Sequence, residues 1–206
     1  MKTYERRLQE SFGAVLREAG EFFMGQGDVY RTLKRLAERL DGEGIPYALI
    51  GGLALARHGL VRMTQDVDIL LTAAGLAAFK ERCVGRGYVL AFAGAHKTFR
   101  DTETGVRIEV ITSGEYPGDG LPKPVVFPAP DEAAEEREGI HVVGLEKLIE
   151  LKLASGLSAP HRLRDLADVQ DLIEAVQLHL ALADKLDASV RDKYVELWKA
   201  SQEAEG

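Results

Sequence analysis

Apolar residues follow a helical period at the start of the chain and give way to short apolar runs further on. Over residues 4–23 and 28–40 they recur every three or four positions, which predicts two amphipathic helices separated by Gly25-Gln26-Gly27. Short apolar runs bounded by glycine and other turn residues then predict strands. These strands are expected at residues 47–50, 66–71, 89–92, 97–100 and 106–112, with helices at 52–58 and 74–84.

The C-terminal part of the chain returns to the helical period. Three apolar stripes predict helices at residues 143–155, 162–179 and 180–200. Before them, residues 117–130 contain five prolines and are expected to form a loop with at most one edge strand. The pattern therefore predicts an α/β (α+β) fold. A mixed sheet with flanking helices occupies residues 1–142, and a C-terminal helical portion, residues 143–206, packs on it.

Composition narrows the class of protein. The 206 residues are 46% apolar and 29% charged, which is ordinary for a globular protein, and no apolar run approaches the roughly 20 residues that cross a bilayer. The N-terminus lacks the features of a secretory signal and Cys83 is the one cysteine, so we expect a cytoplasmic protein without membrane contact. The net charge of −7 argues against a broad nucleic-acid-coating surface, although a local basic pocket stays compatible with it.

Two aspartates on one predicted strand are the first candidates for chemistry. Asp66 and Asp68 are two residues apart, so their side chains leave the strand on the same face. Two neighbouring carboxylates repel each other unless a proton or a cation joins them. Hard divalent ions such as Mg²⁺ prefer these oxygen ligands and usually bind substrate phosphates as well. The pair therefore indicates phosphoryl chemistry.

A third carboxylate and a pair of glycines complete the candidate site. Glu109 lies on the polar face of the strand at 106–112, and it can join the two aspartates if that strand pairs beside theirs. Three such ligands suit a two-metal centre that steadies the attacking and leaving oxygens of a displacement. Gly51-Gly52 precedes the aspartates, and glycine lets the backbone approach a phosphate closely at the start of a helix.

These motifs resemble a known family. The run Ile-Gly-Gly-Leu-Ala-Leu-Ala-Arg-His-Gly-Leu-Val-Arg-Met-Thr-Gln-Asp-Val-Asp, followed by a strand carboxylate, resembles the nucleotidyltransferase fold shared with DNA polymerase β. It is similar to small bacterial members, among them the toxins of abortive-infection type toxin–antitoxin pairs. A second match is Lys152 followed by Arg162-Leu163-Arg164-Asp165-Leu166-Ala167-Asp168, which resembles the Lys…Arg-x-Lys-Asp-x-x-Asp signature of those relatives. Glu109 stands where the family usually has Asp, and Arg164 where it often has Lys.

The resemblance implies a function and assigns residues to it. It implies transfer of a nucleoside monophosphate from an NTP such as ATP to an acceptor hydroxyl, with Mg²⁺, or Mn²⁺ in its place, as cofactor. Asp66, Asp68 and Glu109 would be the catalytic metal ligands, with Glu109 as ligand or general base. The expected nucleotide-binding residues are Gly51, Gly52, Arg57, Arg62, Thr64, Lys152, Arg164, Asp165 and Asp168. The acceptor would be a tRNA end or a protein, and a cognate antitoxin would be a partner.

Other interpretations stay open at this point. The chain could be a degenerate member that binds a nucleotide or a partner without transfer, or its acceptor could be a small molecule such as an antibiotic. Lys152 lies along an apolar stripe, so it either snorkels to solvent or meets a carboxylate or phosphate. Asp165 and Asp168 could be acids favoured near a helix start, with an Arg164–Asp168 pair. Arg57 and Arg62 could be ordinary surface residues.

Overall fold

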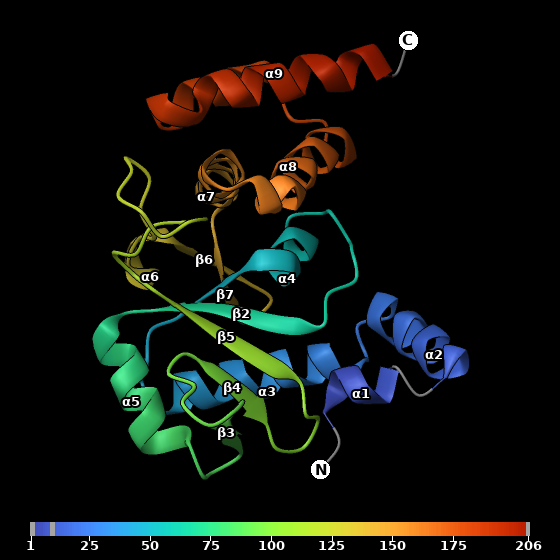
Figure 1. Ribbon diagram of the computed structural model, residues 1–206, viewed down its shortest axis with the longest axis vertical. Coiled ribbons are helices and arrows are strands. Elements are labelled where there is room, and N and C mark those ends of the chain that lie inside the picture. Colours follow the sequence, from blue (N-terminus) through green and yellow to red (C-terminus); the bar gives the residue numbers. More distant parts are fainter. Residues whose placement is uncertain (1–2, 9–10, 205–206) are drawn as a thin grey trace.

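A single mixed sheet forms the centre of the computed structural model, which describes residues 3–8 and 11–204 (Figure 1). The strand order is β3-β4-β5-β2-β1-β7-β6. β2 pairs in parallel with β5, and β1 with β7, while the other neighbours are antiparallel. The strands are β1 (Ala48–Ile50), β2 (Asp66–Leu71), β3 (Tyr88–Leu90), β4 (Thr98–Asp101), β5 (Arg107–Thr112), β6 (Ala134–Arg137) and β7 (Ile140–Val143).

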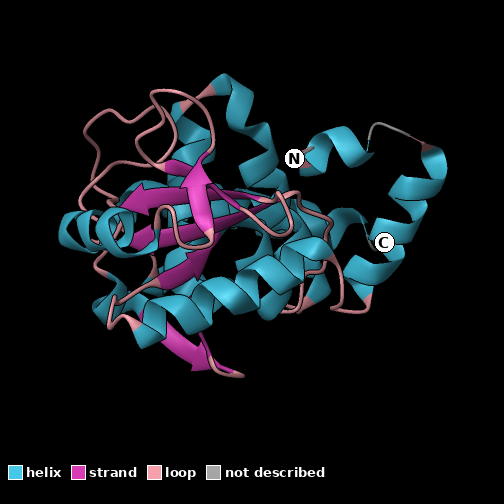
Figure 2. Cartoon of the chain, turned by 90° about the horizontal axis from the view of Figure 1, so that it is seen from below, coloured by secondary structure: helices cyan, strands magenta, loops and turns pink. Residues whose placement is uncertain are grey.

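Helices cover both faces of this sheet. α3 and α5 lie on one side, whereas α4, α7 and α8 lie on the other, with α9 outermost (Figures 1 and 2). The α-helices are α1 (Tyr4–Leu8), α2 (Phe12–Phe23), α3 (Asp28–Gly42), α4 (Gly51–Arg57), α5 (Ala73–Cys83), α6 (Pro130–Ala133), α7 (Leu145–Ser158), α8 (Leu163–Ala175) and α9 (Ala188–Ala204). Two short 3-10 helices, η1 (Pro160–Arg162) and η2 (Leu180–Lys185), join α7 to α8 and α8 to α9.

The apolar pattern places the core where the sequence predicts it. On α3 the stripe of Val29, Leu33, Leu36 and Leu40 is buried. β5 alternates between buried and half-buried positions, so its apolar face packs into the core and its other face is free for polar side chains. The α/β class with a mixed sheet and flanking helices is therefore confirmed. The division at residues 142 and 143 stays a prediction.

The opening helix differs from its prediction. The stretch 4–23 forms two helices, α1 and α2, and residues 9 and 10 between them lie outside the described part. Ser11 is the N-cap of α2: its backbone is extended, with φ −162° and ψ 154°, and its hydroxyl accepts a hydrogen bond from the Ala14 N–H at 3.1 Å. A serine side chain that satisfies a free helix N–H favours a new helix start over a continuous helix.

Three further differences concern the second half of the chain. Residues 134–143 form the unpredicted β6–β7 hairpin, whose two-residue turn holds Glu138 and Gly139 at positive φ. The segment 117–129 contains no strand. The helix predicted over 180–200 is interrupted after η2, because Leu186 is extended and the Asp187 carboxylate accepts hydrogen bonds from the backbone N–H and hydroxyl of Ser189.

Among the described residues, no helix combines the length and the apolar character that a membrane crossing needs.

Candidate active site

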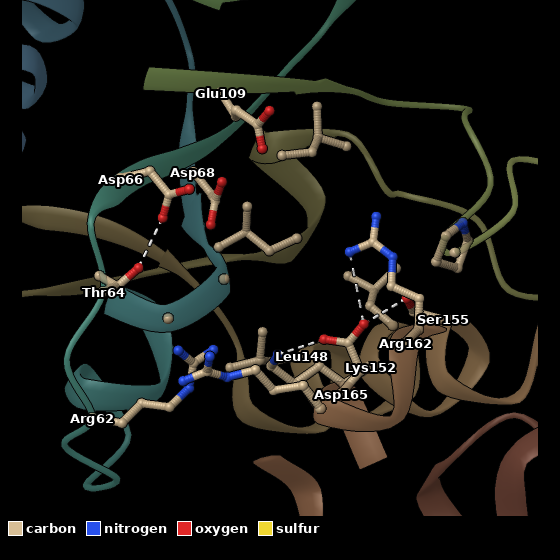
Figure 3. Close-up of a pocket in the computed structure, with 18 of the residues that line it drawn as sticks. Arg62, Thr64, Asp66, Asp68, Glu109, Leu148, Lys152, Ser155, Arg162 and Asp165 are labelled. Carbon is tan, nitrogen blue, oxygen red and sulfur yellow. Dashed lines mark hydrogen bonds and ion pairs between the residues drawn. The ribbon is translucent and has the colours of Figure 1, made fainter. Parts of the chain in front are cut away.

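The parallel pairing of β2 with β5 brings the predicted carboxylates together. Asp68 is directly opposite Glu109 in the register, and Asp66 is two residues earlier on the same face of β2. One carboxylate oxygen from each of Asp66, Asp68 and Glu109 lies within 4.8 Å of the others, and all three residues are half-buried. Figure 3 shows the three side chains turned toward a common space. We call these three residues the carboxylate wall.

The carboxylate wall carries unbalanced negative charge. Burial, together with the charges of Asp66 and Glu109, raises the pKa of Asp68 to about 8, and Lys152 and Arg107 oppose this only in part. The Thr64 hydroxyl donates to Asp66 at 2.8 Å, and Arg107 forms an ion pair with Glu109. In the described part of the chain, no group donates a hydrogen bond to the Asp68 carboxylate. A proton or a cation is therefore needed to stabilise the cluster.

Gly51 has a structural reason to be glycine. Its φ is +71°, and a Cβ there would lie 2.1 Å from Oδ2 of Asp68. Gly52 is less constrained: its Cβ would lie 3.1 Å from the Cβ of Thr64 and 3.3 Å from Nη1 of Arg62. The glycine pair thus lets the turn between β1 and α4 approach the carboxylate wall, which leaves little room for any side chain at the first position.

Opposite this wall, positive and negative side chains neutralise each other. Lys152 of α7, only 6% exposed, donates to Asp165 at 3.0 Å and to Asp168 at 2.6 Å. Ser155 donates to Asp165 at 2.7 Å, and Nε of Arg62 lies 2.6 Å from Asp168. Lys152 therefore meets carboxylates rather than snorkelling. We call Lys152, Asp165, Asp168 and Arg62 the paired wall.

A cavity of about 750 Å³ separates the two walls. Its lining includes the whole carboxylate wall, Gly51, Gly52, Thr64 and, from the other side, Arg62, Lys152, Asp165 and Arg164. Arg164 is exposed and has no ion pair with any described residue, so the predicted Arg164–Asp168 pair does not form. This volume is within the range of small-molecule and cofactor sites.

Two of the predicted nucleotide-binding residues do not line this cavity. Arg57 forms an ion pair with Glu138, and its guanidinium carbon lies 5.9 Å from the centre of the Tyr30 ring. It is the last residue of α4, at the end opposite the glycine pair. Asp168 is buried behind the lining and reaches the cavity only through its partners, Arg62 and Lys152.

The sequence reasoning missed the loop that follows β5. Pro117, Gly118 and Phe127 from this loop line the cavity, as do Ser155 and Arg162 from the helical portion. Gly118 packs against the end of α7, where a Cβ would lie 1.9 Å from Oγ of Ser158. A proline-rich loop directly after the strand of Glu109 was the available signal, since loops at the ends of strands often carry functional residues.

Comparison with known proteins gives similarities of fold. No model of a protein family matches the chain, and no curated protein matches it. Among solved structures, a candidate nucleotidyltransferase of H. pylori is 19% identical with a TM-score of 0.44, covering 84% of this chain and 91% of its own. One from Thermotoga maritima is 20% identical with a TM-score of 0.46, covering 66% and 89%.

A third solved structure is ANT(2")-Ia in complex with adenylyl-2"-tobramycin. It is 13% identical to this chain, with a TM-score of 0.49, and the match covers 87% of this chain and 98% of that one.

Proposed function

We propose that this protein transfers a nucleoside monophosphate from an NTP to an acceptor hydroxyl and releases pyrophosphate, with a divalent cation held by the carboxylate wall. The observation that carries this proposal is the convergence of Asp66, Asp68 and Glu109 from two parallel strands onto one side of the cavity. Three carboxylates this close together, without a full set of protein donors, need a proton or a cation to balance them, and a divalent cation can balance all three at once.

The donor set fits a hard divalent ion. All three groups offer carboxylate oxygens, which Mg²⁺ prefers and Mn²⁺ also accepts, and no thiolate or imidazole belongs to the cluster. Asp68 is the proposed central ligand, since no described residue donates to it. When bound, the cation supplies electrostatic stabilisation of the phosphoryl oxygens and lowers the pKa of a coordinated hydroxyl.

The residues of the chain would divide the remaining work. Thr64 holds Asp66 in place through its hydroxyl, and the glycine pair leaves space for phosphate oxygens beside the carboxylate wall. Glu109, with 38% of its side chain exposed, would accept the proton of the acceptor hydroxyl as that oxygen attacks the α-phosphorus. The α–β phosphoanhydride bond then breaks and pyrophosphate leaves. Arg62 and Arg164 are the proposed contacts for the triphosphate.

The resemblance extends this proposal to the acceptor and partner. It suggests a tRNA end or a protein hydroxyl as the acceptor, ATP among the donors, and a cognate antitoxin that would restrain the activity. The exposed Arg164, which lines the cavity and has no ion pair with any described residue, supplies local positive charge in a chain of net charge −7, and this suits an anionic acceptor.

One observation favours a second candidate function. Arg107 forms an ion pair with Glu109, and a neutralised carboxylate is a weaker base. A protein that binds an NTP and a cation without transferring the nucleotide would keep the same cavity. The two functions differ in whether pyrophosphate appears.

A two-step experiment tests the proposal. Calorimetric titration of each NTP with and without Mg²⁺ measures binding, and pyrophosphate release is then followed with bulk tRNA, a protein extract or a small hydroxyl compound as acceptor. We expect binding that requires the cation, followed by release with one acceptor class. The variant Asp66→Asn should lose both signals, whereas Asp171→Asn, at an exposed position of α8, should retain both. Binding without release under every acceptor would favour the second candidate. If NTP binding were the same with and without the cation, and the same in Asp66→Asn as in wild type, the proposed metal site would be refuted.

A further inference from the structure

Asp168 of α8 binds two cationic side chains next to the cavity, although it does not line the cavity itself. It is 2% exposed. Its Oδ2 accepts hydrogen bonds from Nη2 of Arg62 at 2.9 Å and from Lys152 at 2.6 Å. Nε of Arg62 lies 2.6 Å from Oδ1 as part of the same ion pair. Because Asp168 lies behind the lining residues, it acts on a bound molecule only through these two cations.

The contact with Arg62 fixes the direction of a guanidinium group. A guanidinium is planar, so holding Nε and Nη2 on one carboxylate determines where Nη1 points. Nη1 of Arg62 lies 3.3 Å from the position that a Cβ of Gly52 would occupy, and both residues line the cavity. This short distance places Nη1 beside the turn between β1 and α4, and the side chain is 23% exposed.

We propose that Asp168 is a positioning residue: it aims Nη1 of Arg62 at the paired glycines, where phosphate oxygens of the NTP are bound. This inference rests on the proposed function, which places the triphosphate beside Gly51 and Gly52. It differs from the direct nucleotide contact that the sequence predicts for Asp168. Arg62 neutralises one of the two negative charges on Asp165 and Asp168, and Lys152, which donates to both carboxylates, neutralises the other.

A purely electrostatic role for Asp168 and a positioning role predict opposite changes in NTP affinity when Asp168 is replaced. Replacing Asp168 by Asn removes one negative charge from the paired wall, so charge alone would strengthen the binding of an anionic triphosphate. If Asp168 instead orients Arg62, the same substitution weakens NTP binding. Asn offers one acceptor oxygen where the carboxylate offers two, so the Arg62 guanidinium group is no longer held in one orientation. The sign of the change in Kd therefore distinguishes the two roles.

The experiment measures the Kd of the tightest-binding NTP, with Mg²⁺, for the full-length wild type and for Arg62→Gln, Asp168→Asn and their double variant. We expect each single variant to raise Kd about tenfold or more, and the double variant to be no weaker than Arg62→Gln alone. Asp192→Asn, at an exposed position of α9, is the control and should bind as wild type does. Melting temperatures are recorded for every variant.

Arg62→Lys supplies a test that does not depend on changing the buried aspartate. Lysine keeps the positive charge but has no planar fork, so it should bind the NTP about as poorly as Arg62→Gln does. Three results would each overturn the positioning role. They are wild-type affinity for the NTP in Arg62→Lys, tighter NTP binding in Asp168→Asn, and additive losses of affinity in the double variant. Failure of the wild type to bind any NTP would instead overturn the proposed function itself.

Discussion

The two walls of the cavity carry similar charged side chains but arrange them in opposite ways. On the carboxylate wall, three acids converge and Asp68 receives no hydrogen bond from the described residues. On the paired wall, Lys152 and Arg62 face Asp165 and Asp168 at distances of 2.6–3.0 Å. Like charges held together with too few partners indicate a site that binds an external cation, whereas a balanced buried network indicates a rigid support.

Removing the central cation of the paired wall should have the largest effect. Lys152→Met keeps the shape of the side chain but leaves Asp165 and Asp168 with less compensation in a buried place. We expect the free energy of unfolding in urea to fall by about 3–5 kcal/mol. The matched control is Lys185→Met, which removes an exposed lysine from its pair with Glu146 and should change stability far less. Equal losses in the two variants would erase the distinction between a buried network and a surface pair.

On the carboxylate wall, neutralising one acid should leave the fold intact and remove the cation. Asp68→Asn relieves repulsion, so stability without metal should stay the same or rise. The Kd for Mn²⁺, measured by calorimetry, should increase about 100-fold or more, since changing even outer-shell groups of a metal site weakens binding by about 10–100-fold. A variant that melts normally and binds Mn²⁺ as wild type does would remove Asp68 from the metal site.

The approach of the glycine turn can be tested with two matched substitutions. Gly51 and Gly85 both have positive φ, but a Cβ would meet Asp68 at the first position and open space at the second. Gly85→Ala should lose about 1 kcal/mol of stability from backbone strain alone. Gly51→Ala should lose more and should also weaken Mn²⁺ binding, because the new methyl group displaces the Asp68 carboxylate. Similar behaviour of the two variants would show that the contact with Asp68 is unimportant.

The stability of the metal-free protein should also depend on pH. Burial and the neighbouring acids raise the pKa of Asp68 to about 8 in the folded state, well above its unfolded value. The folded protein then keeps a proton that the unfolded chain has lost. The resulting stability is present at low pH and is lost progressively as pH rises from about 4 toward 8.

Urea unfolding in EDTA across this pH range measures the effect. The slope should be reduced in Asp68→Asn, and saturating Mg²⁺ should reverse the loss near pH 8 in the wild type. A wild-type slope equal to that of the Asn variant would show that the carboxylate wall is not the source.

The sequence predicted what depends on local spacing. β2 begins and ends where the alternation of Asp66, Val67 and Asp68 with the apolar run indicates, and the polar face of Glu109 follows from the same period. The parallel pairing of β2 with β5 is a contact between segments about 40 residues apart, so the sequence could state it only as a condition.

The ion-pair partners of individual charged residues could not be predicted from their local spacing in the sequence. Spacing on one helix suggested that Asp168 pairs with Arg164, yet its partners come from α7 and from the segment before β2. Arg57 was predicted near the nucleotide because it follows the glycine pair, but the length of α4 carries it to the other end, beside Glu138. The β6–β7 hairpin was missed because its first strand is charged and exposed, as an edge strand often is.

The in-register alignment of β2 and β5 has a consequence for how this protein tolerates change during evolution. Loops before and after these strands can lengthen or shorten without moving the acids relative to one another. A single-residue insertion or deletion inside either strand, between its acids and its anchoring apolar positions, turns the acids of that strand toward the opposite face. Descendants that keep the chemistry should therefore vary freely in loop length and hold these two six-residue segments free of gaps.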